Sequence, residues 1–186
     1  MARLLAARGA AVVDADEIAR RLLRPGGASL AAVVARFPGA VGAGGVLDRA
    51  ALAAIVFADP AERRDLEALT HPAIREEMVA EIARVPATTP VVVAVIPLLV
   101  ESPGPRPETD AVAVVDCPEE VAMARLAARG MSAGDARARM AAQVGRDVRR
   151  AHADHVIDNA GDPDQLQVEV DRCWAWATGL AGAAER

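Results

Sequence analysis

The first twenty residues, MARLLAARGAAVVDADEIAR (1–20), indicate the fold class of the chain. Residues 1–8 have the leucines and arginines of a helix end, and Gly9 stands where a left-handed residue closes a helix. Residues 11–13 then read as a short buried strand that ends on Asp14. A helix that leads into a buried strand usually follows another strand in an α/β fold. We therefore expect an α/β fold, with a further strand ahead of this stretch.

Three more apolar segments have the composition of buried parallel strands. Each is short, rich in valine and ends near a polar or turn residue. They lie at residues 91–96, 111–115 and 155–157. The pattern between them predicts helices from residue 48 to the His71–Pro72 boundary, over 73–84 and over 118–129. This alternation predicts a parallel sheet flanked by helices.

Composition limits the function classes that fit the chain. Its 186 residues suffice for one domain with a sizeable core, which we place at residues 1–186. No apolar run is long enough to span a membrane, and a net charge of −5 argues against a nucleic-acid surface. Cys117 and Cys173 form no CxxC pair, so we expect reduced thiols and a cytoplasmic protein. All 21 basic residues are arginine, so a catalytic lysine would have to come from outside this chain.

Two aspartates at the end of the first strand are candidate functional residues. Ligands of open α/β sheets bind at the carboxyl ends of the strands, so Asp14 and Asp16 could line a cleft. The alternative is that Asp16 caps a helix that starts near Glu17. His71 precedes a proline, a position more typical of a helix boundary than of a ligand. The histidines lack zinc-ligand spacing, so we expect no protein metal site.

Arginines gather in the segment that follows the third strand. Such a run is usually a solvated helix face. Several arginines over a cleft can also neutralise a phosphoryl group in transit, so both interpretations stay open. The members are Arg125, Arg129, Arg137, Arg139, Arg146, Arg149 and Arg150.

Five segments, in order, make the chain resemble dephospho-coenzyme A kinase. They are VVDADEIARRLLRPG (12–26), GVLDRAALAAIVFADPAERRDLEALTHPAIREE (45–77), IPLLVES (96–102), VDCPEE (115–120) and RMAAQVGRDVRRAHADHVIDN (139–159). The resemblance implies a P-loop kinase fold with a helical acceptor-binding insertion at about 25–85 and a helical lid at about 118–150. It also implies transfer of the ATP γ-phosphate to the ribose 3′-hydroxyl of dephospho-coenzyme A, with Mg²⁺ accompanying ATP.

The same resemblance assigns roles to individual residues. Asp16 would be the general base, and His71 would line the acceptor pocket. Further substrate contacts would come from Asp14, Arg20, Pro97, Leu98 and Glu101. Lid and nucleotide contacts would come from Arg125, Arg129, Arg139, Gln143 and Arg146.

Three features depart from the family pattern. The family begins with a strand and a P-loop, GxxxxGK[ST], and no such motif occurs in these 186 residues. We therefore expect that the recorded sequence starts too late, that the first strand is missing and that the chain as given lacks transfer activity. We also expect the strands at 91–96 and 111–115 not to pair with each other. Val95 and Ala122 replace an aspartate and a glutamine that are usual there, which bears on magnesium and lid contacts.

Two other functions remain open. One is a non-catalytic remnant that binds a coenzyme A-like ligand or a partner. The other is a different small-molecule P-loop kinase, such as a nucleoside monophosphate kinase, although the LDR (47–49) and HP (71–72) segments speak against it.

Overall fold

The computed structural model describes residues 1–101 and 109–184, and the chain divides into two compact units. The first unit comprises Met1–Ala11, Ala87–Val93 and Leu98–Arg186. The second unit comprises Val12–Pro86 and Ala94–Pro97. The Pro-rich segment SPGPRP (102–107), whose composition predicts a turn, lies outside the described residues.

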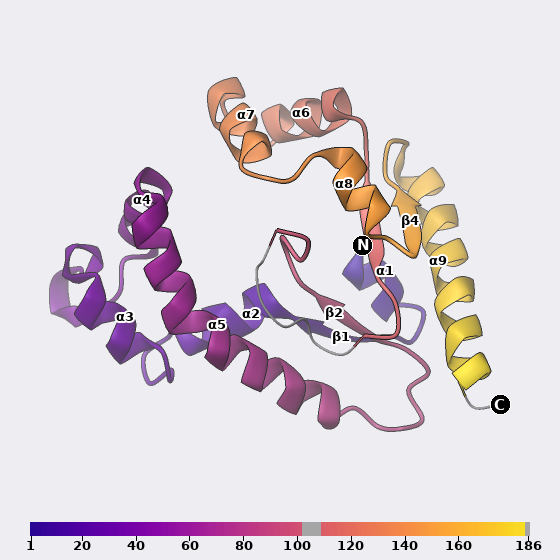
Figure 1. Ribbon diagram of the computed structural model, residues 1–186, viewed down its shortest axis with the longest axis horizontal. Helices are drawn as coiled ribbons and strands as arrows, with labels where there is room; N and C mark the ends of the chain where they lie inside the picture. The colour runs from indigo at the N-terminus through magenta and orange to yellow at the C-terminus, as the bar shows by residue number, and fades with distance from the viewer. Residues whose placement is uncertain (102–108, 185–186) are drawn as a thin grey trace. The chain divides into compact units, whose positions relative to one another are not determined.

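A parallel strand pair forms the centre of the first unit. β3 (Ala113–Asp116) pairs with β4 (His155–Asp158) in parallel, from Ala113 opposite His155 to Asp116 opposite Asp158. Helix α9 (Pro163–Ala184) lies along β4, and α1 (Ala2–Ala6) packs on α9 (Figure 1). The expected parallel strands flanked by helices are thereby confirmed.

The core of the first unit lies where these elements meet. It is apolar, and α9 contributes both tryptophans to its border, where the Trp176 ring stacks on His155 with 4.7 Å between ring centroids. The buried members are Leu5, Ala10, Ile157, Val170 and Cys173, with Trp174 and Trp176 packed against them.

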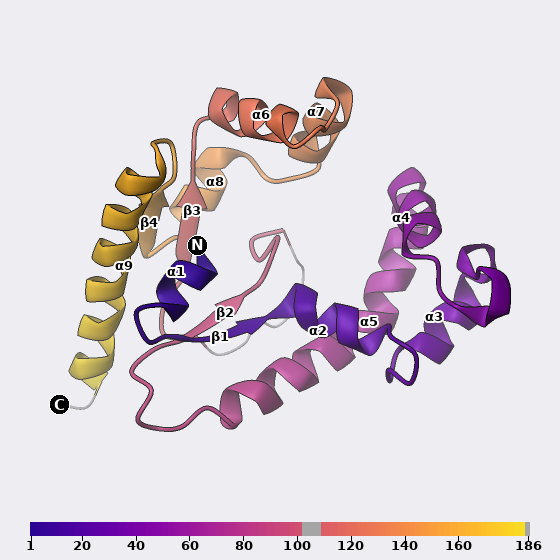
Figure 2. The ribbon, with the colours of Figure 1, turned by 180° about the vertical axis from the view of Figure 1, so that it is seen from behind.

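Three short helices connect β3 to β4 along the chain (Figure 2). They are α6 (Glu119–Ala128), α7 (Ala133–Ala141) and α8 (Arg146–Ala151). Helix α6 packs on α7, and α8 packs on β3. These helices occupy most of the segment that the sequence assigns to a lid.

The second unit is a helical body. Helices α2 (Ala15–Leu22) and α4 (Arg49–Ala58) both pack on the long helix α5 (Pro60–Ala83) (Figure 1). The remaining elements are α3 (Leu30–Arg36) and two 3-10 turns, η1 (Pro38–Ala40) and η2 (Ala43–Gly45). Three of these helices begin on capping aspartates, because a carboxylate oxygen satisfies the otherwise unpaired N–H groups of the first turn. The capping residues are Asp14, Asp48 and Asp59.

Helix α5 runs through Pro72, so the helix boundary expected at His71–Pro72 is wrong. The break comes earlier, at Asp59, whose carboxylate accepts a 2.7 Å hydrogen bond from the Ala61 N–H. An internal proline removes one backbone donor and crowds the preceding turn. Buried Thr70 and Met78 lie on either side of Pro72, and this packing holds the two halves in one helix.

The remaining strands form a second two-stranded sheet. β1 (Ala11–Asp14) pairs with β2 (Val92–Val95). Within the described residues β2 and β3 belong to different sheets, which confirms the prediction that the strands at 91–96 and 111–115 do not pair. Among the described strands, β2 and β3 therefore each keep an unpaired edge, a feature that favours association with other strands.

The core of the first unit offers a test of its contribution to stability. Ile157 is 1% exposed, so Ile157→Ala should lower the free energy of unfolding by about 2–5 kcal/mol through lost burial and a residual cavity. Val168→Ala is the control, because Val168 is 50% exposed and its loss should change stability by less than about 0.5 kcal/mol. Urea unfolding followed by circular dichroism measures both. Equal effects would show that Ile157 is not a core residue.

Candidate functional site

The end of β1 presents the two predicted acidic residues in different roles. The Asp14 carboxylate caps α2, with Oδ1 accepting hydrogen bonds from the N–H groups of Asp16 at 2.9 Å and Glu17 at 3.2 Å. The alternative that Asp16 caps the helix is therefore wrong, because α2 begins two residues earlier than expected. The Asp16 side chain is exposed in the first helical turn and has no hydrogen-bond or ion-pair partner among the described residues. Its side chain is therefore open to solvent.

Two arginines brace the helix that carries Asp16. The Arg20 Nε donates to the Asp16 carbonyl oxygen at 3.1 Å. From the start of α4, the Arg49 guanidinium donates to the Arg20 carbonyl oxygen at 2.7 Å. The sequence alone assigns no role to Arg49, although it lies in the LDR segment (47–49). The sequence signal for its position is that it directly follows Asp48, the residue that caps α4.

The other predicted substrate residues lie apart along the chain. His71 is exposed on α5, and Pro97 is exposed two residues after the end of β2. Leu98 adopts a left-handed backbone conformation, φ 56°, which is uncommon for a bulky residue, and its side chain is 48% exposed. Glu101 accepts a 3.1 Å hydrogen bond from the Val144 N–H, in the connection between α7 and α8. Glu101 therefore holds the segment predicted as a lid.

The predicted lid residues make contacts of two kinds. Arg125 of α6 donates to the Asn159 carbonyl oxygen and, at 2.7 Å, to that of Gly161, so it secures the loop after β4. Gln143 accepts a 3.5 Å contact from Arg149. Arg129 ends α6 with an exposed side chain, and Arg139 lies in the last turn of α7.

A buried aspartate at the end of β3 binds two arginines of α8. The Asp116 side chain is only 4% exposed. Arg146 donates through Nε to Oδ1 at 2.9 Å and to Oδ2 at 3.0 Å, and through Nη2 to Oδ2 at 2.7 Å. Arg150 donates through Nη1 to Oδ2 at 2.6 Å. The hydrogen bonds from Arg146, followed by that from Arg150, hold the pKa of Asp116 below its ordinary value.

The sequence alone does not identify Asp116 as a site residue, although it lies in the segment VDCPEE (115–120) of the family resemblance. The available signal was repetition: AVVD occurs at 11–14 and again at 113–116, and HVID ends the last strand. Strands β1, β3 and β4 therefore all end on an aspartate. In open α/β sheets this end of the strands is the one that meets ligands.

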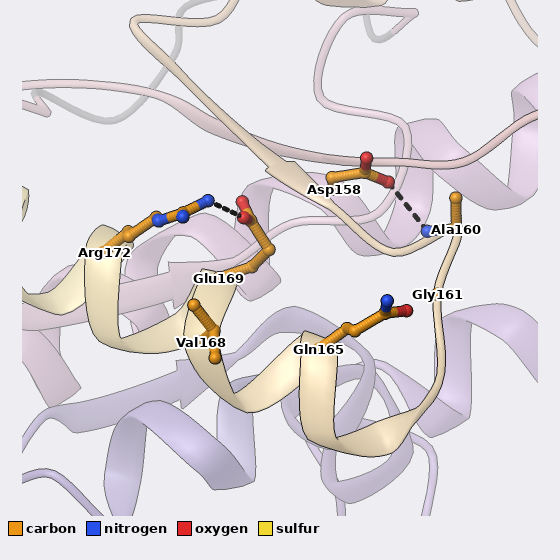
Figure 3. Close-up of a pocket in the computed structure, with 7 residues that line it drawn as sticks. All are labelled: Asp158, Ala160, Gly161, Gln165, Val168, Glu169 and Arg172. Atoms are coloured by element: carbon orange, nitrogen blue, oxygen red, sulfur yellow. Dashed lines mark hydrogen bonds and ion pairs between the residues drawn. The ribbon is translucent and has the colours of Figure 1, made fainter.

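An open pocket of about 510 Å³ lies at the start of α9 (Figure 3). Its polar groups are satisfied by neighbours: the Asp158 carboxylate accepts from the Ala160 N–H at 2.8 Å, and Glu169 pairs with Arg172. None of the site residues predicted from the sequence lines it. The lining residues are Asp158, Ala160, Gly161, Gln165, Val168, Glu169 and Arg172.

Neither a metal centre nor a membrane span is found in the described part of the chain. Across residues 1–101 and 109–184, no three side chains of His, Cys, Asp or Glu converge on a point where a metal ion would fit. Over the same ranges, no helix combines the length and apolar character needed to cross a bilayer.

Comparison with known proteins identifies the family. A family model described as dephospho-CoA kinase matches residues 1–165. The dephospho-CoA kinase of Frankia casuarinae is 46% identical over 171 residues, which cover 91% of this chain and 74% of that protein. That of Burkholderia lata is 44% identical over 187 residues, covering 99% and 92%.

Two solved structures have a similar fold. TT1252 from Thermus thermophilus superposes with a TM-score of 0.80 at 35% identity, covering 94% of this chain and 88% of that one. The dephospho-CoA kinase from Campylobacter jejuni has a TM-score of 0.64 at 21% identity, covering 95% and 89%, and so shares the fold. The protein belongs to the dephospho-CoA kinase family.

Proposed function

We propose that this protein transfers the γ-phosphate of ATP to the ribose 3′-hydroxyl of dephospho-coenzyme A. Family membership supports the reaction class. The observation that carries the proposal is the free, exposed carboxylate of Asp16, two residues beyond the end of β1. The two cysteines of the protein, Cys117 and Cys173, form no disulfide, which supports a reducing, cytoplasmic location.

Asp16 would act as the general base. The 3′-hydroxyl oxygen attacks the γ-phosphorus, the bond from that phosphorus to the β-phosphate bridging oxygen breaks, and ADP leaves. The hydroxyl proton passes to the Asp16 carboxylate. Arg49 and Arg20 would keep Asp16 in place by bracing the backbone of α2. A base needs to be within hydrogen-bond reach of the proton that it removes, so rigidity at this position favours transfer.

Arginines supply the positive charge on the phosphate side. Phosphoryl transfer depends almost entirely on positioning and on electrostatic stabilisation of the transferring group. Arg146 is proposed to contact the nucleotide, with Arg129, Arg139 and Gln143 as further lid contacts and Arg125 holding the adjacent loop. Asp14, His71, Pro97, Leu98 and Glu101 remain proposed on the acceptor side. The left-handed backbone of Leu98 supports a ligand-facing role, because such strain is concentrated at functional sites.

Mg²⁺ has no complete set of ligands in the described residues. Kinase Mg²⁺ is typically held by a few protein groups together with substrate phosphates. We therefore propose Mg²⁺ only as the ion that accompanies ATP.

The test is an acceptor panel with ATP. The polypeptide is made with a family-type strand and P-loop ahead of residue 1, because residues 1–186 contain no such loop. Transfer to dephospho-coenzyme A is expected, seen as a product heavier by one phosphate, and none is expected to a 3′-deoxy analogue. Transfer to nucleoside monophosphates instead would identify a different kinase. Binding of dephospho-coenzyme A without turnover would identify a non-catalytic binder.

A further inference from the structure

The arrangement around Asp116 fixes two guanidinium groups without using all their donors. Arg146 places Nε and Nη2 on the carboxylate, and Arg150 places Nη1 there. Within the described residues, no bond engages Nη1 of Arg146, or Nε and Nη2 of Arg150. Both arginine side chains are 45% exposed, whereas the carboxylate is 4% exposed. The Asp116 carboxylate is therefore buried, whereas the unused N–H donors lie on arginine side chains that are partly open to solvent.

Within the hydrogen-bonded group of Asp116, Arg146 and Arg150, one carboxylate faces two guanidinium groups. Asp147 of α8 also acts electrostatically on Arg146, so the open donors of the two arginines, and not a surplus charge, distinguish this cluster. Burying an unpaired carboxylate costs free energy, so the two arginines stabilise the charge of Asp116. In return, Asp116 fixes the orientation of both guanidinium groups. Arginine presents planar, forked donors that match phosphate oxygens, and a fixed fork loses less freedom on binding than a mobile one.

We propose that Asp116 is a positioning residue of the nucleotide site, which holds Arg146 and Arg150 of α8 in one orientation with donors open to ATP phosphate oxygens. The inference rests on the proposed function and deepens it, because it adds Arg150 as a phosphate ligand and gives Asp116 a role. Asp116 itself touches no substrate.

Three further hydrogen bonds fix the segments on either side of this cluster. Glu101 accepts from the Val144 N–H at 3.1 Å, and Arg149 donates to the Val144 carbonyl oxygen at 2.7 Å, so the chain entering α8 is held from two directions. The Asp116 carbonyl oxygen accepts from the Asn159 N–H at 2.7 Å. Asp116 thus joins α8 through its side chain and the loop after β4 through its backbone.

The kinetic test uses the polypeptide with the added P-loop. Asp116→Asn keeps the size of the side chain but removes its charge, so the arginines lose their fixed orientation. We expect kcat/KM for ATP to fall at least tenfold, since a displacement of about 1 Å can cost about 10²-fold. The KM for dephospho-coenzyme A should stay within about twofold, and Asp116→Glu should recover part of the loss. An unchanged kcat/KM for ATP would overturn the proposal.

The control for loss of an aspartate–arginine pair is Asp171→Asn, at a carboxylate that is 64% exposed. Asp171 pairs with Arg8 at 2.6 Å, also in the first unit, but between α9 and the residues after α1. This variant loses an aspartate–arginine pair and should leave kcat/KM for ATP unchanged. Equal losses in both variants would mean that general destabilisation, not positioning, is responsible.

Hydrogen exchange on the 186-residue chain separates this inference from the proposed function. Asp116→Asn should speed amide exchange in α8, and Asp171→Asn should not; unchanged exchange in α8 would overturn the proposal. If the parent polypeptide transferred phosphate to no acceptor, the proposed function would fail. Calorimetric Kd values for ATP would then decide, because the proposal requires weaker binding in Asp116→Asn than in Asp171→Asn.

Discussion

Asp16→Asn is expected to lower turnover by about 10²–10⁴-fold, the usual contribution of a general base, in the polypeptide with the added P-loop. Asparagine has nearly the same size but cannot take the proton of the 3′-hydroxyl. The helix should stay intact, because Asp14 and not Asp16 caps α2. Coupled detection of ADP release gives the rate, and calorimetry should show nearly unchanged binding of dephospho-coenzyme A.

Glu17→Gln is the control for this substitution. Glu17 is the next residue of the same helical turn, is also exposed and is assigned no role. Its loss should leave turnover within about twofold, well below the range expected for a base. A drop of less than about tenfold for Asp16→Asn would show that another group accepts the proton.

The 186-residue polypeptide alone is expected to show no measurable transfer, and the version with the added strand and P-loop is expected to be active. The P-loop supplies a ring of backbone N–H groups and a lysine that bind the phosphates, and a hydroxyl that would hold Mg²⁺. Residues 1–186 contain neither that motif nor any lysine. Mobile arginines can attract ATP, but they do not replace donors that are already in position.

The two polypeptides are compared side by side at equal concentration, with ADP release as the readout. The 186-residue form should retain weak binding of dephospho-coenzyme A, because Asp16 and His71 are present. Comparable turnover from both forms would place the phosphate site elsewhere and would remove the proposed mechanism.

The strands and the family were predictable because their signals are local. Short valine runs that end near a polar residue identify the four strands of the described residues to within about two residues, and the parallel direction of β3 and β4 follows from the α/β pattern. The separation of β2 from β3 was also predicted. These features depend on composition and order, which the sequence states directly.

The errors concern choices that depend on packing. A pre-proline residue usually ends a helix, but buried Thr70 and Met78 carry α5 through Pro72. Asp14 and Asp16 are both suitable residue types to cap the N-terminus of α2. Asp14 is the cap because α2 begins at Ala15, and this starting residue is known only from the structure. Asp116 becomes notable only when α8 brings Arg146 and Arg150 to it, from 30 and 34 residues along the chain.

The tryptophans on α9 have a consequence for how this protein can be observed. The chain has two tryptophans and no tyrosine, and both tryptophans border the core of the first unit. Of Trp, Tyr and Phe, the second unit contains only the phenylalanines Phe37 and Phe57. Tryptophan absorbance and emission therefore come from the first unit alone, whereas far-ultraviolet circular dichroism records the helices of both units. Thermal unfolding followed by both tryptophan emission and far-ultraviolet dichroism distinguishes one cooperative transition from two. The two unfolding curves coincide only if both units unfold in a single transition.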